Sequence, residues 1–114
     1  RQYFNVGGEN VIWQDIESNR LRMTNFGPDR ADHIELKIYG GFTLGAAVQG
    51  ENGEIFYIII QDGEPEDKSS TRAAVLFKIN ERGEILKEQD LDTSKATGLD
   101  LYSMHTSCLL AFNP

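Results

Sequence analysis

The sequence contains a single cysteine, Cys108, and no long hydrophobic stretch. One cysteine cannot form a disulfide within the chain, and it cannot build a cysteine-based zinc site by itself. The longest apolar run, IFYIII at residues 55–60, is much too short to cross a bilayer, and no segment has the pattern of a signal peptide. We therefore expect no membrane insertion.

The chain also has fewer basic than acidic residues. The chain carries 11 Lys and Arg against 18 Asp and Glu, which gives a formal net charge of −7, and the basic residues are scattered. Nucleic-acid binding needs clustered Lys and Arg side chains to replace the counterions of the phosphates, so we expect no nucleic-acid partner. With 39% hydrophobic and 25% charged residues, the composition is that of an ordinary globular protein.

The periodicity of an amphipathic helix is missing throughout. Short runs rich in Val, Ile, Phe and Tyr are bounded instead by Gly, Asn and Asp. This pattern predicts strands at residues 11–17, 20–25, 33–39, 43–49, 55–61, 73–79, 85–91 and 106–112. Tight turns are predicted at residues 51–54, where Asn52-Gly53 suits positive φ angles, and at residues 80–83. Consecutive hairpins of this kind make an all-β antiparallel meander.

Four successive strands differ from one another in composition. The strand at residues 43–49 carries small side chains, those at 55–61 and 73–79 are apolar on both faces, and the one at 85–91 is largely polar. An unbroken apolar strand must be covered on both faces. This order is similar to one blade of a β-propeller, whose inner strand is crowded and whose outer strand meets water. The resemblance concerns architecture and implies no particular family.

Internal repetition favours the same interpretation. Val6 in VGGEN matches Val48 in VQGEN at an offset of 42, close to the roughly 40 to 50 residues of typical blade repeats. At a second offset, 63, four residues match four others: Leu36, Ile38, Tyr39 and Thr43 match Leu99, Leu101, Tyr102 and Thr106. The chain is then about two blades of an incomplete β-propeller, beginning late in one inner strand and ending in a third.

This interpretation makes residues 1–114 part of one repeat-built all-β domain and a fragment of a longer protein. Because a ring usually has at least four blades, the expected partners are the remaining part of the parent protein or further copies of the chain. The alternative folds are a small closed β-barrel and a β-sandwich.

The meander also predicts where ligands bind. The two tight turns should lie at one end of the sheet and the long polar segments at the other, where binding residues concentrate. The ligand-binding candidates at that second end are Asp62, Asp67, Asp100 and His105. The alternative is that these side chains only keep polar loops solvated.

A calcium site is an alternative for the same end of the sheet. Asp90, Asp92 and Ser94 follow the Asp-x-Asp-x-Ser pattern with which calcium loops begin. The pattern is incomplete, because Lys95 stands at the sixth position in place of glycine and Leu101 at the twelfth in place of glutamate. We expect no cofactor, with calcium as the alternative.

No catalytic constellation is recognisable, since GxSxG, P-loop and dinucleotide motifs are all absent. His105 is the alternative catalytic residue, because it begins a predicted inner strand, but it corresponds to Phe42 in the repeat and can equally be a packed position. Cys108 is not its partner, since residues three apart on a strand point to opposite faces.

These observations predict a non-enzymatic binding or structural module that belongs to a larger β-propeller-like assembly. One alternative is a fragment of a propeller enzyme with a channel-mouth histidine. Another is a calcium-stabilised adhesive or lectin-like module.

Three aromatic residues, Tyr3, Trp13 and Tyr57, can stack on a sugar or a partner if they are exposed. Val11, Trp13 and Asp15 share one face of their strand, while Ile12 and Ile16 share the other. Since a single Trp is most often packed, we expect Trp13 in the core.

Overall fold

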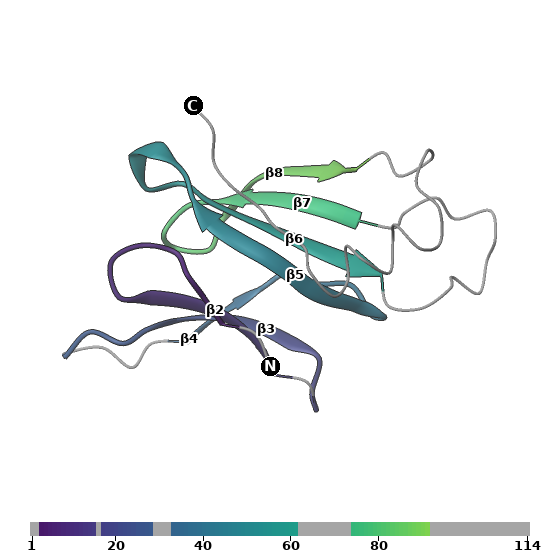
Figure 1. The fold of residues 1–114 in the computed structure, drawn as a ribbon, viewed down its shortest axis with the longest axis horizontal. Coiled ribbons are helices and arrows are strands. Elements are labelled where there is room, and N and C mark those ends of the chain that lie inside the picture. The colour runs from purple at the N-terminus through teal and green to yellow at the C-terminus, as the bar shows by residue number, and fades with distance from the viewer. Residues whose placement is uncertain (1–2, 16, 29–32, 62–73, 92–114) are drawn as a thin grey trace.

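The computed structural model describes residues 3–15, 17–28, 33–61 and 74–91, and in these ranges the protein consists of two four-stranded antiparallel sheets (Figure 1). The first sheet contains β1 (Tyr3–Asn5), β2 (Asn10–Asp15), β3 (Arg20–Asn25) and β4 (His33–Leu36), and the second contains β5 (Phe42–Gln49), β6 (Ile55–Gln61), β7 (Ala74–Ile79) and β8 (Ile85–Asp90). Within each sheet the strands are neighbours in chain order. The predicted all-β antiparallel meander is confirmed.

The two alternative folds were a small closed β-barrel and a β-sandwich. In the described part of the chain the two sheets remain separate and do not close on each other, so the closed barrel is wrong. The two sheets do pack as two layers, as in a β-sandwich, but each sheet consists of four strands that follow one another in the chain. The described residues also contain no helix long and apolar enough to span a membrane.

The strand bounds agree closely with the sequence patterns. Residues 20–25 and 55–61 are strands as predicted, whereas β4 ends at Leu36 instead of continuing to residue 39. Residues 37–41, here named the exit segment, leave the first sheet after β4 and lead to β5. The strand predicted at residues 106–112 lies outside the described residues.

The main core lies between the two sheets. The first sheet contributes Ile12, Leu21 and Met23, and the second contributes Tyr57, Ile59 and Phe77, all at most 2% exposed. Alternation explains these faces, because every second residue of a strand points to the same side. Each such side chain contributes about 1.5 to 3 kcal/mol by leaving water.

The second sheet buries side chains on its other face as well. Ala46, Ile58, Ile60 and Ala74 form a second apolar cluster there, at 0 to 4% exposed. Gly45 in β5 has no room for a larger side chain, since a Cβ there would lie 2.6 Å from Ile60 Cδ1. All six residues of β8 are exposed. The middle strands are therefore covered twice and the last strand is wet, as their compositions indicate.

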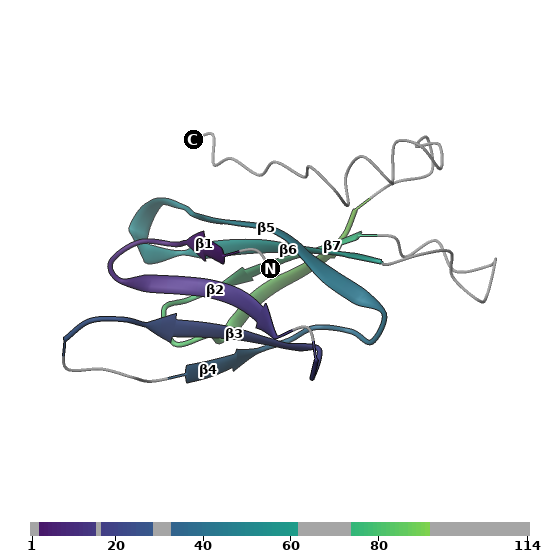
Figure 2. The same cartoon turned by 60° about the horizontal axis from the view of Figure 1, so that its bottom comes forward.

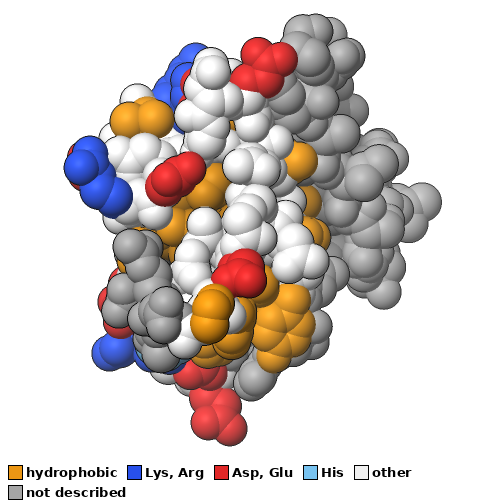
Figure 3. All heavy atoms as spheres, turned by 90° about the vertical axis from the view of Figure 1, so that its left-hand side faces the viewer, with side chains coloured by type: hydrophobic (Ala, Val, Ile, Leu, Met, Phe, Trp, Pro, Cys, Tyr) orange, Lys and Arg blue, Asp and Glu red, His pale blue; other side chains and the backbone are white. Residues whose placement is uncertain are grey.

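The turns after β1, β5 and β7 lie at one end of the two sheets, on the left of Figure 1. Asn52 and Gly53 have φ angles of 59° and 78°, which the predicted Asn-Gly turn requires. The turns after β1 and β5 make the same backbone bond, from Val6 N to Asn10 O and from Gly50 N to Glu54 O. Equivalent positions in these turns are therefore 44 residues apart, and Val6 corresponds to Gly50 rather than to Val48, its match in the sequence at an offset of 42. Figure 3 shows this end, with charged side chains scattered among hydrophobic ones.

Gln61, Ala74 and Leu91 border the two long segments that the structure does not describe. They lie together at the opposite end of the second sheet, where Ile60 pairs with Ala74 and Leu91 N donates to Ala74 O. The predicted separation of tight turns from long connections is thus found. At the centre of the molecule β1 lies beside β5 (Figure 2).

Candidate functional site

Asp90 is the one candidate ligand from the sequence that the structure describes. It is the last residue of β8 and pairs with Val75 in the ladder. The other candidates, Asp62, Asp67, Asp92, Ser94, Asp100 and His105, lie outside the described residues. Within the described ranges, no group of three or more His, Cys, Asp or Glu side chains could hold a metal ion. Two other groups of polar side chains occur in the two sheets.

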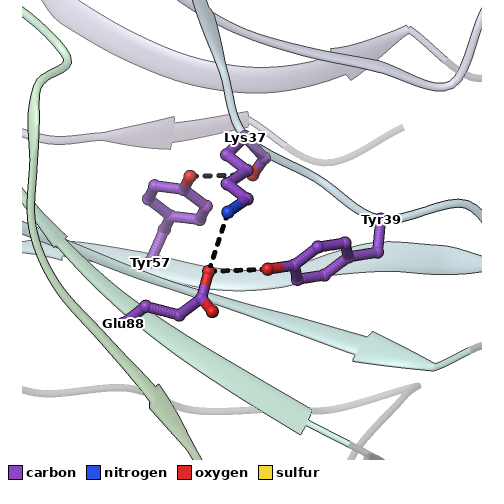
Figure 4. Close-up of polar contacts among 4 residues, drawn as sticks. All are labelled: Lys37, Tyr39, Tyr57 and Glu88. Atoms are coloured by element: carbon purple, nitrogen blue, oxygen red, sulfur yellow. Dashed lines mark hydrogen bonds and ion pairs between the residues drawn. The ribbon is translucent and has the colours of Figure 1, made fainter.

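The first group, here named the exit cluster, comprises Lys37, Tyr39, Tyr57 and Glu88 (Figure 4). Lys37 and Tyr39 belong to the exit segment, whereas Tyr57 lies on β6 and Glu88 on β8. The Tyr39 hydroxyl donates to Glu88 Oε1 at 2.7 Å, and Lys37 Nζ lies 3.3 Å from the same oxygen. The Tyr57 hydroxyl donates to the Lys37 carbonyl oxygen at 2.8 Å. The exit segment is therefore held on the second sheet by its backbone and by two side chains.

Burial and hydrogen bonding raise the pKa values of two groups in this cluster, Tyr57 and Lys37. The Tyr57 side chain is fully buried and stacks on Phe77 with ring centres 4.9 Å apart. Desolvation raises the pKa of Tyr57 well above its usual value, so the hydroxyl keeps its proton and its hydrogen bond. The hydrogen bond with Tyr39, and then that with Glu88, raises the pKa of Lys37. Because Glu88 binds the Tyr39 hydroxyl and the Lys37 ammonium group, and Tyr57 binds the Lys37 carbonyl, the cluster fixes the exit segment on the second sheet.

The second group, here named the outer row, comprises Tyr3, Trp13, Arg22 and Glu35 on the outer face of the first sheet. These four residues stand directly opposite one another in register, one on each strand. The rings of Tyr3 and Trp13 stack with centres 6.4 Å apart, and Arg22 Cζ lies 5.6 Å from the centre of the Trp13 ring. Tyr3 is 57% exposed and the Glu35 side chain 62%, so this row faces solvent at both ends.

Trp13 is not in the core between the sheets, so the expectation for it is wrong. Ile12 takes the core position, and Trp13 lies half-buried on the outer face, where its indole N–H donates to Thr24 Oγ1 at 2.9 Å. The Thr24 hydroxyl lies 2.8 Å from His33 Nδ1. The predicted alternation along β2 is confirmed, and it places Trp13 with polar neighbours.

A hollow of about 470 Å³ lies between the turns that follow β5 and β7. Its lining residues are Asn52, Gly53, Glu54, Asn80, Glu81, Arg82 and Leu86. The turn itself uses Asn80 Oδ1, which accepts bonds from the backbone N–H groups of Arg82 and Glu84. Arg82 also pairs with Glu84 at 2.9 Å. These contacts stabilise the turn.

Sequence patterns did not reveal the exit cluster or the outer row. Both depend on strand register, which decides that Trp13 stands between Tyr3 and Arg22. The signal that was available is the alternation in β2, which put Trp13 and Asp15 on one face. Nothing in the sequence linked Tyr39 to Glu88, which are 49 residues apart.

By its fold the protein is an all-β protein with two consecutive antiparallel meanders packed face to face. Comparisons with family models, with curated proteins and with solved structures find nothing that matches the chain. The proposals below therefore depend on the residues of this chain alone.

Proposed function

We propose that the chain is a non-enzymatic binding or structural module that contributes two blades to a larger β-propeller-like assembly. The assembly is completed by the remaining part of the parent protein or by further copies of the chain. In this arrangement the two sheets are consecutive blades, β1 and β5 are inner strands, and β4 and β8 are outer strands.

The observation that carries the proposal is the burial of apolar side chains on both faces of the second sheet. Ile59 and Phe77 pack toward the first sheet, while Ile58 and Ile60 form the cluster on the other face. A sheet with one wet face has polar residues on that side, whereas a sheet inside a stack of layers is apolar on both. Propeller blades are such layers, because each lies between two neighbours.

The dependence of unfolding on protein concentration tests the proposal. If further copies complete the structure, the free energy of unfolding rises with protein concentration, because association stabilises the folded form. Ile59→Ala should lower this free energy by about 2 to 5 kcal/mol at every concentration, since it opens a cavity between the sheets. Ile58→Ala should lower it at every concentration as well, because Ile58 is only 4% exposed within the single chain.

Sedimentation velocity over a wide concentration range supplies the second measurement. We expect particles heavier than the 12.8 kDa chain for the wild type. A stable, well-dispersed 12.8 kDa monomer whose unfolding is independent of concentration would contradict the proposal.

A further inference from the structure

The outer row of the first sheet corresponds, position by position, to a row on the second sheet. Ala47, Tyr57, Phe77 and Glu88 stand opposite one another on β5 to β8, as Tyr3, Trp13, Arg22 and Glu35 do on β1 to β4. Both rows begin two residues before the last pair of their first hairpin, which is Asn5 with Val11 or Gln49 with Ile55. We name the second set the inner row.

The inner row has a known occupant in this structure, namely the first sheet and its exit segment. Ala47, Tyr57 and Phe77 belong to the core between the sheets, and the ring of Tyr39 lies 6.3 Å from that of Phe77. Glu88, at the end of the row, accepts a hydrogen bond from the Tyr39 hydroxyl and forms an ion pair with the Lys37 ammonium group. A row of this design therefore binds an exit segment that brings one basic side chain and one tyrosine to its terminal glutamate.

The outer row keeps the essential parts of this design. Trp13 replaces Tyr57 as the large ring, Arg22 replaces Phe77 as the group that stacks beside it, and Glu35 replaces Glu88 at the end. The distance from Arg22 Cζ to the Trp13 ring centre, 5.6 Å, compares with 4.9 Å between the rings of Tyr57 and Phe77. Glu35 is paired with Arg20, but both side chains are more than half exposed, and such a pair is weak.

We infer that the outer row is the docking site for the exit segment of a further blade, one that carries a basic residue and a tyrosine as Lys37 and Tyr39 do. The inference rests on the proposed blade arrangement and names the chemistry of the neighbour. The basic residue forms an ion pair with Glu35, the tyrosine hydroxyl donates to the same carboxylate, and the aromatic ring packs beside Arg22.

The chain's own segments fit this site poorly, which is why the occupant is a partner blade rather than a second copy. The exit segment after β4 is already held by Glu88. In the repeat that matches Tyr39 with Tyr102, Asp100 takes the place of Lys37. A second copy would thus bring a carboxylate toward Glu35, and like charges at contact distance repel.

A sugar is a less suitable occupant. Stacking on a sugar requires an open aromatic face, but Trp13 has Tyr3 beside it on β1 and Arg22 beside it on β3. Trp, Tyr and Arg together are the residues enriched at the centres of protein interfaces. The composition of the row therefore favours a protein neighbour.

The test uses the intact chain and a synthetic peptide of residues 36–43, LKIYGGFT. The chain has one tryptophan, so its single indole N–H resonance reports on the outer row. We expect the peptide to shift this resonance saturably at millimolar concentration. A control peptide with Lys37→Asp should bind about five- to tenfold more weakly, because an attraction becomes a repulsion, and the Glu35→Gln chain should bind the original peptide about threefold more weakly.

Three results would overturn the inference. The first is that the peptide at the highest concentration does not shift the indole resonance, and the second is that the two peptides shift it equally. The third is that the Glu35→Gln chain binds the peptide as tightly as the wild type. Glu35 is exposed, so this substitution should leave the fold intact. Dilution of the chain without peptide tests the second copy as occupant. If dilution alone moves the indole resonance and Glu35→Gln abolishes that movement, a second copy fills the site and the assignment to a partner blade is wrong. Failure here leaves the sedimentation test of the proposed function untouched.

Discussion

Gln14 on β2 is joined to the backbone of Leu44 on β5, with Leu44 N–H donating to Gln14 Oε1 at 2.9 Å. The side chain of Gln14 is 8% exposed, and its amide nitrogen also donates to Asn19 Oδ1 at 2.7 Å. The ladder between β5 and β6 is irregular between Leu44 and Ala46. A side chain of the first sheet thus satisfies a backbone group of the second sheet beside this irregularity.

Replacing Gln14 by Leu should lower the free energy of unfolding by about 1 to 3 kcal/mol. The apolar side chain fits the core, but the buried N–H of Leu44 loses its acceptor, and an unsatisfied buried donor is costly. Urea denaturation measures the change. The matched control is Gln89→Leu on the exposed strand β8, for which we expect a change within about 0.5 kcal/mol. Equal effects at the two positions would show that the bond to Leu44 contributes nothing.

Gly83→Ala should be destabilising by about 1 to 3 kcal/mol. Gly83 has a φ angle of 80°, and a Cβ there would lie 2.6 Å from Ile34 Cγ2 on the other sheet. Thermal unfolding measures the loss. Gly40→Ala is the control, because its Cβ would meet no atom within 4 Å and its backbone has no positive φ, so it should leave stability unchanged or slightly higher.

A double-mutant cycle separates the two causes at Gly83. If the contact with Ile34 matters, Ile34→Ala should cost less in the Gly83→Ala chain than in the wild type, because the smaller side chain relieves the clash. Additive effects would assign the whole loss to backbone strain.

Added Ca²⁺ should leave the melting temperature unchanged. Asp90 would be the first ligand of the calcium pattern, yet its backbone pairs with Val75 inside the β8 ladder rather than in a loop. Lys95 and Leu101 also stand where a calcium loop needs glycine and glutamate. Calorimetry after addition of Ca²⁺ or of a chelator checks this. The Ca²⁺ concentration should be millimolar, on the order of a thousandfold above a micromolar dissociation constant. A melting temperature that rises with Ca²⁺ and falls with Asp90→Asn would favour the calcium-stabilised module instead.

The strands and the Asn52-Gly53 turn could be predicted because their signals are local. Alternation separates Ile12 from Trp13, and Asn-Gly admits the positive φ angles that the turn shows. The partners of each face could not be predicted. Ile58 and Ile59 are chemically identical, and only the packing of the sheets decides that Ile59 meets the first sheet while Ile58 lies on the other face.

The candidate sites were less predictable than the strands for a related reason. A polar residue such as Gln14 in a half-buried strand gives no sign that it bonds Leu44, 30 residues away. The hydrogen bond from Tyr39 to Glu88 forms because the exit segment crosses to the second sheet, and the hydrophobic pattern of the sequence does not predict this crossing. Long-range polar contacts of this kind depend on register and sheet packing together.

The exit cluster predicts a loss of stability in alkaline solution. Burial raises the folded-state pKa of Tyr57 above its unfolded value near 10, and hydrogen bonding to Tyr39 raises that of Lys37. A group whose pKa is raised on folding contributes its stability fully below the unfolded pKa and loses it as the pH rises toward the folded one. The stability should therefore be constant near neutrality and decline above about pH 10.

Tyr57→Phe isolates the part that Tyr57 contributes. At pH 7 it should lower the free energy of unfolding by about 1 kcal/mol, since the Lys37 carbonyl loses its donor. Between pH 10 and 11 the wild type should lose up to about 1.4 kcal/mol per pH unit more than the variant, which is the value for one proton. Urea unfolding across this range measures both effects. The control is Tyr3→Phe, at a side chain that is 57% exposed, and it should keep the wild-type decline. Parallel pH profiles for Tyr57→Phe and the wild type would show that Tyr57 ionises as readily in the folded protein as in the unfolded chain.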